Sequence, residues 1–151
     1  MSDTERLGND LLRAAARLSR WASRNAAFDV PFAQARLLAL LDELGPSRIS
    51  ALAEADNTSQ PTMTAQVHRL EAAGWAQRAG DPDDTRAVII SLSPAGSRKL
   101  REVRRARAAV LEPALSRLVG SSPDRVGEAV RLLEELLAIT SSPHPHPRKD
   151  G

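Results

Sequence analysis

The residues whose types and spacing point most clearly to chemistry lie between Ser59 and Arg69, a stretch of hydroxyl, amide and basic side chains without an acid. If this stretch is helical, Met63, Val67 and Leu70 share one face and pack against a core. The opposite face then carries short side chains that fit a DNA major groove, where Thr and Gln can read base edges. Free N–H groups at the helix start can bind phosphate. The candidate DNA-binding residues here are Ser59, Gln60, Pro61, Thr62, Thr64, Ala65, Gln66, His68 and Arg69.

A second charged group, residues 80–86, includes Asp84 and Arg86 and separates two short runs of strand-forming residues. These runs, 75–79 and 87–92, predict a β-hairpin with the charged loop at its tip. Arg86 at such a tip is a candidate for contact with DNA, because a hairpin tip needs no arginine for its stability. Simpler interpretations stay open: Arg86 is a solvated loop residue paired with a nearby aspartate, and the preceding helix merely exposes a polar face.

The rest of the sequence predicts the helices that must position these two groups. Apolar residues recur at helical spacing in several segments, and Gly and Pro interrupt the pattern between them. We expect helices at about 3–27, 32–44, 60–74 and 94–119, a two-turn helix capped by Ser50, and a last helix that starts at 121–123. Pro113 should bend or break the long helix that contains it. The order helix, short helix, turn, helix, strand, loop, strand is that of a winged helix-turn-helix, so the predicted fold class is mostly α with a small β-hairpin wing.

Composition narrows the function further. The 151 residues carry a net charge of +2 and contain 3% aromatics and no cysteine. The missing cysteine excludes disulfides, a thiol nucleophile, a thiol redox sensor and Cys-ligated zinc. No apolar run approaches the roughly 20 residues that span a bilayer, and the N-terminus lacks the apolar stretch of a signal peptide. We expect a soluble cytoplasmic protein without membrane contact. The sequence holds no Gly-rich phosphate loop and no Ser-His-acid set, so we expect no enzymatic activity, cofactor or metal site.

Two motifs resemble one known family. Residues 59–75, Ser-Gln-Pro-Thr-Met-Thr-Ala-Gln-Val-His-Arg-Leu-Glu-Ala-Ala-Gly-Trp, resemble the recognition helix of MarR-family transcriptional regulators. Asp84-Thr-Arg86, followed by Leu92-Ser-Pro-Ala-Gly96, resembles that family's wing signature. The resemblance extends over about 4–140 and implies helices for dimerisation at 4–30 and 97–140, with a winged DNA-binding module at 31–96. It also implies that Arg86 enters the minor groove and that Asp84 orients the wing.

The resemblance implies a homodimer that binds a pseudo-palindromic operator in double-stranded DNA, most often as a repressor. It also implies a small phenolic effector, for which Trp21, Phe28 and Phe32 are candidate pocket residues, although plain core or interface packing is the favoured interpretation of these three. For an anionic effector the candidates are Arg17, Arg20 and Arg24, which are otherwise solvated. Two departures from the family pattern leave the operator open. Ala65 stands where relatives often have arginine, and Gln66, where an apolar residue is common, faces either DNA or the preceding helix.

Two other classes of function remain as alternatives, a protein-interaction module and an architectural, sequence-neutral DNA binder. The basic residues between Arg98 and Arg107 predict a solvated helix face that adds long-range attraction to phosphate. The segment 141–151 has no apolar anchor and should be a disordered tail. Its His144 and His146 make a poor metal site.

Overall fold

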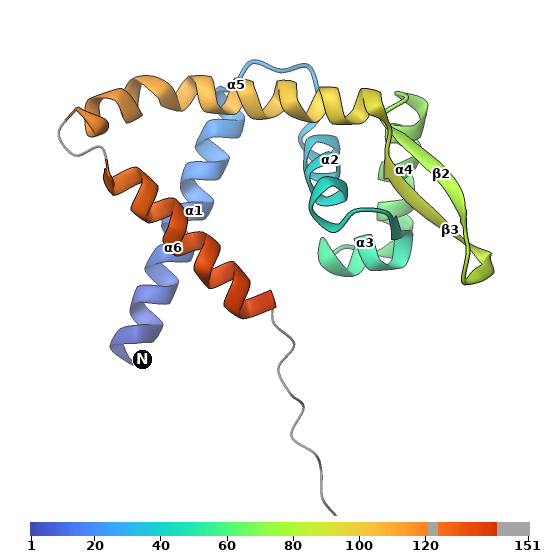
Figure 1. Cartoon of the computed structure of the whole chain (residues 1–151), viewed down its shortest axis with the longest axis horizontal. Helices are drawn as coiled ribbons and strands as arrows, with labels where there is room; N and C mark the ends of the chain where they lie inside the picture. Colours follow the sequence, from blue (N-terminus) through green and yellow to red (C-terminus); the bar gives the residue numbers. More distant parts are fainter. Residues whose placement is uncertain (121–123, 142–151) are drawn as a thin grey trace, which may run out of the picture. The chain divides into compact units, whose positions relative to one another are not determined.

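The computed structural model describes residues 1–120 and 124–141 (Figure 1). In these ranges the chain is mostly helical, with one small antiparallel sheet. The elements are α1 (Asp3–Asn25), α2 (Phe32–Leu44), β1 (Ser47–Arg48), α3 (Ile49–Ala55), α4 (Gln60–Ala72), β2 (Ala76–Asp81), β3 (Asp84–Leu92), α5 (Pro94–Val119) and α6 (Asp124–Ser141). They form two compact units, one of residues 1–110 and one that begins at Leu111. The predicted fold class is confirmed.

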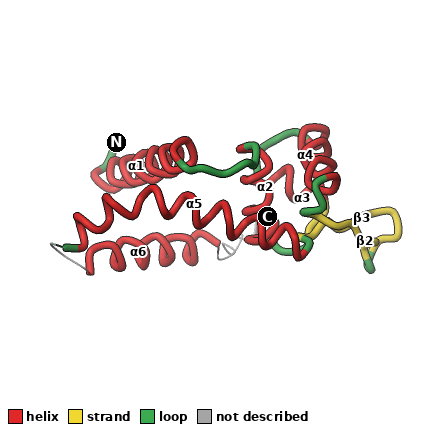
Figure 2. The backbone as a smooth tube through the Cα atoms, turned by 90° about the horizontal axis from the view of Figure 1, so that it is seen from above, coloured by secondary structure: helices red, strands yellow, loops and turns green. Residues whose placement is uncertain are grey.

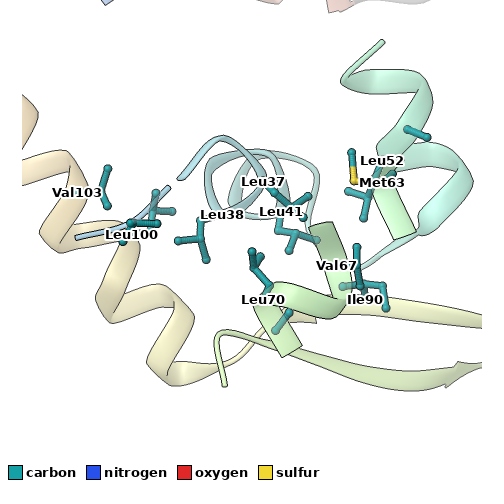
Figure 3. Packing of buried hydrophobic residues seen from close by; sticks show 13 residues of the cluster. Leu37, Leu38, Leu41, Leu52, Met63, Val67, Leu70, Ile90, Leu100 and Val103 are labelled. Carbon is teal, nitrogen blue, oxygen red and sulfur yellow. The ribbon is translucent and has the colours of Figure 1, made fainter. Parts of the chain in front are cut away.

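The core of the first unit is aliphatic, as the low aromatic content predicts. Figure 3 shows its side chains converging from α2, α3, α4, β3 and α5. Phe28 and Trp75 are only partly buried and pack against it. The fully buried members are Leu38, Leu41, Leu52, Met63, Val67, Leu70 and Ile90. This single cluster fixes the helix-turn-helix and the sheet against each other.

Helix α4 begins and ends where its sequence requires. Ser59 is the N-cap, and its hydroxyl accepts a hydrogen bond from the Thr62 N–H at 3.2 Å. Pro61 lies in the first turn, where a backbone N–H has no helical partner in any case. The helix stops before Gly74, whose φ of +76° favours a residue without a Cβ. The predicted position of this helix is therefore confirmed.

The sheet has the strand order β1-β3-β2, with both pairs antiparallel. The hairpin strands are longer than predicted: β2 continues to Asp81 and β3 starts at Asp84, so 80–86 is not a long loop. A register shift at Gly80/Asp81 accommodates the polar tip, and this pairing outweighs the weak strand propensity of those residues. Figures 1 and 2 show the hairpin extending beyond α4.

The start of α3 also differs from the prediction. Ser47 and Arg48 form the two-residue strand β1, which pairs with Ile89 and Ile90 of β3. Arg48 is therefore the N-cap residue of α3, and no side chain caps this helix. The predicted Ser50 cap is wrong, because Ser50 already lies inside the first turn.

Helix α5 starts in close contact with the first residues of the hairpin. The Ser93 hydroxyl accepts from the Gly96 N–H at 3.0 Å, which confirms the predicted cap, and donates to the Gly74 carbonyl at 2.5 Å. A Cβ at Gly96 would lie 1.9 Å from the Trp75 carbonyl oxygen. Only glycine allows this approach of helix to strand.

The second unit contains the end of α5 and the whole of α6. The predicted break at Pro113 is absent: α5 continues through it, since the missing N–H removes one hydrogen bond from a helix of 26 residues. Helix α6 has no buried residue, although Val130, Leu133 and Leu137 form an apolar stripe on it. The predicted start of the last helix at 121–123, the tail from 142 onward and its two histidines lie outside the described residues. Among the described helices, none combines the length and apolar character needed to cross a membrane.

Candidate nucleic-acid interface

The outer face of α4 is exposed and free of acidic residues in its first turn. Its opposite face is fully covered, since Met63, Val67 and Leu70 have exposed fractions of 1% or less. Thr64 and Gln66 are half-buried at the border between the two faces. The exposed candidates are Ser59, Gln60, Pro61, Thr62, Ala65, His68 and Arg69. The structure thus brings most of the predicted residues onto one accessible surface.

Hydroxyl groups at the start of α4 are held by bonds within the chain. Ser59 Oγ donates to Thr62 Oγ1 at 2.7 Å, and Thr64 Oγ1 donates to the Gln60 carbonyl at 2.8 Å. Within the described chain, Thr62 Oγ1 acts only as an acceptor, so its own O–H is available to a ligand. Thr62 is therefore the hydroxyl best placed to donate to a base edge or a phosphate.

Gln66 does not join the outer face. It borders a small cavity of about 170 Å³ together with Ala33 and Leu37 of α2. Its Oε1 is buried and has no hydrogen-bond partner among the described residues. The sequence left two orientations open, toward DNA or toward the preceding helix α3; the structure instead places Gln66 beside α2.

Arg86 lies on β3 near the hairpin tip, and its side chain is exposed. Asp84 Oδ1 accepts from the Arg86 backbone N–H at 3.0 Å. Asp84 therefore shapes the backbone that carries Arg86, and the Arg86 guanidinium makes no ion pair with any residue that the structure describes. Both residues lie in a strand, which positions the arginine more rigidly than the predicted loop would.

Asp81 is a buried acid of the hairpin that the sequence did not single out. It is 8% exposed, and its carboxylate accepts from Arg48 Nε at 2.7 Å and from the Asp83 N–H at 2.9 Å. The bond from the Asp83 N–H, followed by that from Arg48, lowers the pKa of the Asp81 carboxyl below its ordinary value. Three aspartates stand close together in this turn, and only the fold reveals which one is buried. Asp81 joins the hairpin to β1 and the start of α3.

A second link joins the hairpin to α4. Arg78 of β2 donates to Glu71 through Nε at 2.8 Å and through Nη2 at 3.0 Å. These bonds lower the pKa of the Glu71 carboxyl and raise the pKa of the Arg78 guanidinium. The Arg78–Glu71 and Arg48–Asp81 pairs together fix the hairpin relative to the helix whose outer face is exposed.

Basic residues on α5 divide into paired and free groups. Arg104 pairs with Asp42 at 2.9 Å, and Lys99 pairs with Glu102 at 2.6 Å. Arg98, Arg101 and Arg105 are exposed and make no ion pair within the described residues. These three follow one helix face and add positive charge to the first unit.

The three aromatic candidates for an effector pocket do not meet. Phe28 and Phe32 border a cavity of about 220 Å³ between α1, α2 and α5. Trp21 instead borders an open groove on α1 with Arg17 and Arg24. No cluster of three His, Asp or Glu side chains suited to a metal ion occurs in the described part of the chain.

Comparisons with known proteins agree with this geometry. The sequence profile of the MarR family matches residues 32–88. A protein of Mycobacterium bovis described as an HTH-type transcriptional regulator is 34% identical over 139 residues, which make up 91% of this chain and 96% of that relative. The transcriptional regulator Tm0710 from Thermotoga maritima has a TM-score of 0.67 at 24% identity, over 93% of this chain and 98% of its own. Apo wild-type MarR from E. coli has a TM-score of 0.64 at 20% identity, over 91% and 98%.

Proposed function

Because the chain belongs to the MarR family of helix-turn-helix transcriptional regulators, we propose that it binds its operator through the outer face of α4 and through Arg86. In this arrangement α4 enters the major groove and the hairpin is the wing that contacts the adjacent minor groove. The observation that carries the proposal is the exposed, acid-free start of α4 together with an exposed Arg86, without an ion pair among the described residues, on a hairpin held by two ion pairs. Because its proposed ligand is operator DNA, we propose that the protein acts in the cytoplasm.

The test replaces Arg86 by alanine and measures affinity for an operator selected from random duplexes by the wild-type protein. Arg86→Ala removes one contact to the DNA, so we expect operator affinity to fall roughly tenfold. Binding then releases about one counterion fewer, so the plot of log affinity against log salt concentration should have a shallower slope, by about one. Arg105→Ala is the matched control, because it removes the same charge from an exposed site on α5. Equal losses in both variants would remove the wing from the interface.

Sequence specificity separates a regulator from an architectural protein. Contacts to base edges discriminate by about 1–3 kcal/mol each, so a scrambled duplex should bind much more weakly than the selected operator at equal salt. Equal affinity for both duplexes would support the architectural alternative. No binding of any duplex at low salt would support a protein-interaction module instead.

We propose that the regulator acts as a homodimer on a pseudo-palindrome. Large apolar side chains are exposed on α1, among them Leu7 and Leu12, and along the whole of α6. Such faces are rarely left in water by a monomer. Two-fold symmetry then sets the half-sites about one helical turn of DNA apart.

Repression by promoter occlusion, relieved by a small effector, completes the proposed mechanism. The cavity of about 220 Å³ supports an effector site, because Phe28, Phe32 and Leu100 give it an apolar wall and Arg107 gives it positive charge. An aromatic acid has the matching chemistry. Trp21 does not belong to this site, since it borders a different groove.

A further inference from the structure

Gln66 carries a buried polar atom that the fold leaves without a partner. Its Oε1 accepts no hydrogen bond from any described residue, although the atom is shielded from solvent. Buried polar atoms normally have a partner, and an acceptor without one lowers the stability of the folded state. The free protein therefore gains little from holding the Gln66 amide in this position.

The amide lies beside a cavity of about 170 Å³, here called the α2–α4 cavity, which Gln66 borders together with Ala33 and Leu37 of α2. Arg36 and Asp56 provide the charged part of the cavity wall, but these two residues form an ion pair with each other. Protein interiors are otherwise close-packed. This space consequently allows the Gln66 side chain to change its rotamer without a movement of α4 against α2.

Gln66 also stands next to the outward-facing residues of α4. Thr62 lies four residues before it and Arg69 three residues after it, and both are exposed. Residues with these spacings are neighbours on a helix surface, and a long helical side chain leans toward the turn before its own. Thr62 accordingly borders the same cavity as Gln66. A change of rotamer therefore carries the Gln66 amide from α2 to the row that Thr62 and Arg69 form.

A primary amide has the chemistry to recognise adenine. In the major groove its oxygen accepts from adenine N6 and its nitrogen donates to adenine N7, so that one base satisfies both polar atoms. DNA would thus supply the hydrogen bond that Gln66 Oε1 lacks in the free protein. Side chains at interfaces commonly change rotamer on binding while the backbone moves little.

We propose that Gln66 determines the identity of one operator base. When α4 enters the major groove, the Gln66 amide leaves the α2–α4 cavity and forms two hydrogen bonds with an adenine. Loss of the amide then has opposite effects on two properties: the free protein becomes more stable, and the complex discriminates less between bases. This inference rests on the proposed function, of which it specifies one base contact.

The first experiment selects operators from random duplexes with the full-length wild type, Gln66→Leu and Gln66→Glu. The wild type should require adenine at one operator position, by roughly 5- to 100-fold over another base. Gln66→Leu should accept any base there and keep the rest of the operator. Gln66→Glu should prefer cytosine at the same position, because a carboxylate accepts from cytosine N4.

Gln34→Leu is the matched control for the selection. Gln34 is a half-buried glutamine of α2 that does not border the α2–α4 cavity. This variant should select the wild-type operator. A change of operator shared by Gln34→Leu and Gln66→Leu would overturn the inference, since it would not depend on the Gln66 amide.

A second measurement tests the contact itself with 7-deazaadenine, which pairs with thymine but has no N7 acceptor. Fluorescence anisotropy at fixed salt should show that this base, placed at the selected position, weakens wild-type binding about two- to tenfold. The same base should leave the affinity of Gln66→Leu unchanged. Because the two changes remove the same hydrogen bond, their effects should not add.

Thermal unfolding without DNA tests the free state. Gln66→Leu removes the acceptor that has no partner, so its Tm should exceed that of the wild type by about 2–6 °C. A lower Tm would overturn the inference, because the fold would then be shown to hold the amide in place.

The inference is also wrong if Gln66→Leu selects the wild-type operator, if Gln66→Glu keeps the preference for adenine, or if wild-type binding is insensitive to 7-deazaadenine. Should Gln66→Leu fail to fold, the change from adenine to cytosine in Gln66→Glu decides the question. A wild type that selects no operator contradicts the proposed function as well. A wild type that selects an operator without an adenine that depends on Gln66 contradicts this inference alone.

Discussion

Asp81 is the residue on which the position of the wing depends most directly, because its carboxylate holds both β1 and the hairpin turn. Asp81→Asn keeps the shape of the side chain and removes its charge. We expect operator affinity to fall roughly three- to tenfold, since the wing contacts weaken while those of α4 remain. Fluorescence anisotropy with labelled operator measures the change.

Asp83→Asn is the control for that substitution. It removes the same charge two residues further along the chain. The Asp83 side chain is exposed, and Asp83 bonds to Asp81 through its backbone N–H and not through its carboxylate. It should bind operator as the wild type does. If the two variants lose affinity equally, the loss comes from net charge and not from the position of the wing.

The lowered pKa of Asp81 also predicts a pH dependence of stability. A carboxyl group whose pKa is lower in the folded state stabilises that state above its unfolded pKa, near 4, and loses the effect as the pH falls through the folded value. The difference in Tm between wild type and Asp81→Asn should therefore be constant above about pH 5 and shrink below about pH 4. Calorimetric unfolding over a pH range that extends above the first limit and below the second tests this. A difference that does not change with pH would contradict the assignment.

How far the sequence predicts the site depends on the distance between partners. Thr62 and Arg69 were placed on the outer face of α4 correctly, because the helical period needs only local sequence. The role of Asp81 was not predicted, since Asp81 is selected by Arg48, which lies 33 residues earlier in the chain. Gln66 is a similar case. Its orientation depends on the space beside α2, and the sequence around Gln66 does not indicate that space.

At the scale of elements, α5 makes a close backbone contact with Trp75, the residue before β2. Gly96→Ala would put a methyl group 1.9 Å from the Trp75 carbonyl oxygen, so helix and strand must separate. We expect a loss of about 1–3 kcal/mol in the free energy of unfolding. Gly8→Ala is the opposite case, because nothing lies within 4 Å of a Cβ there and alanine favours a helix. Denaturant unfolding should show a lower free energy of unfolding for Gly96→Ala and a slightly higher one for Gly8→Ala. Equal effects of the two substitutions would contradict the close contact.

The helices were predictable from sequence because capping residues stand at the ends of segments whose apolar residues have helical spacing. Ser59, Gly74 and Ser93 are examples. The sheet was less predictable. Strand β1 has two residues and exists only because Ile89 and Ile90 pair with it. The hairpin extends into a polar segment for the same reason, since a partner strand provides hydrogen bonds that the propensities of Gly80 and Asp81 do not indicate.

At the scale of the whole molecule, the apolar face of α6 determines the proposed assembly. Leu137 is 61% exposed on that face. Leu137→Glu places a charge there with little change in helix propensity. We expect the dimer to dissociate at micromolar concentration and operator affinity to fall by a factor of about 100 or more, because the two half-sites are no longer bound together. Analytical ultracentrifugation and anisotropy measure the two effects.

Glu135→Lys is the control on the polar side of the same helix, where Glu135 is exposed. It should leave the dimer and its operator affinity unchanged. A Leu137→Glu protein that stays dimeric, or a wild type that sediments as a monomer while binding operator tightly, would contradict the proposed assembly.

The scarcity of aromatic residues has a practical consequence for spectroscopy. The chain has two tryptophans and no tyrosine, and Trp75 is half-buried where the hairpin meets α5, with the Lys99 ammonium 5.7 Å from its ring. A Trp21→Phe protein would therefore emit from a single indole at this junction. Its emission wavelength and its quenching would follow local opening there, without any attached dye.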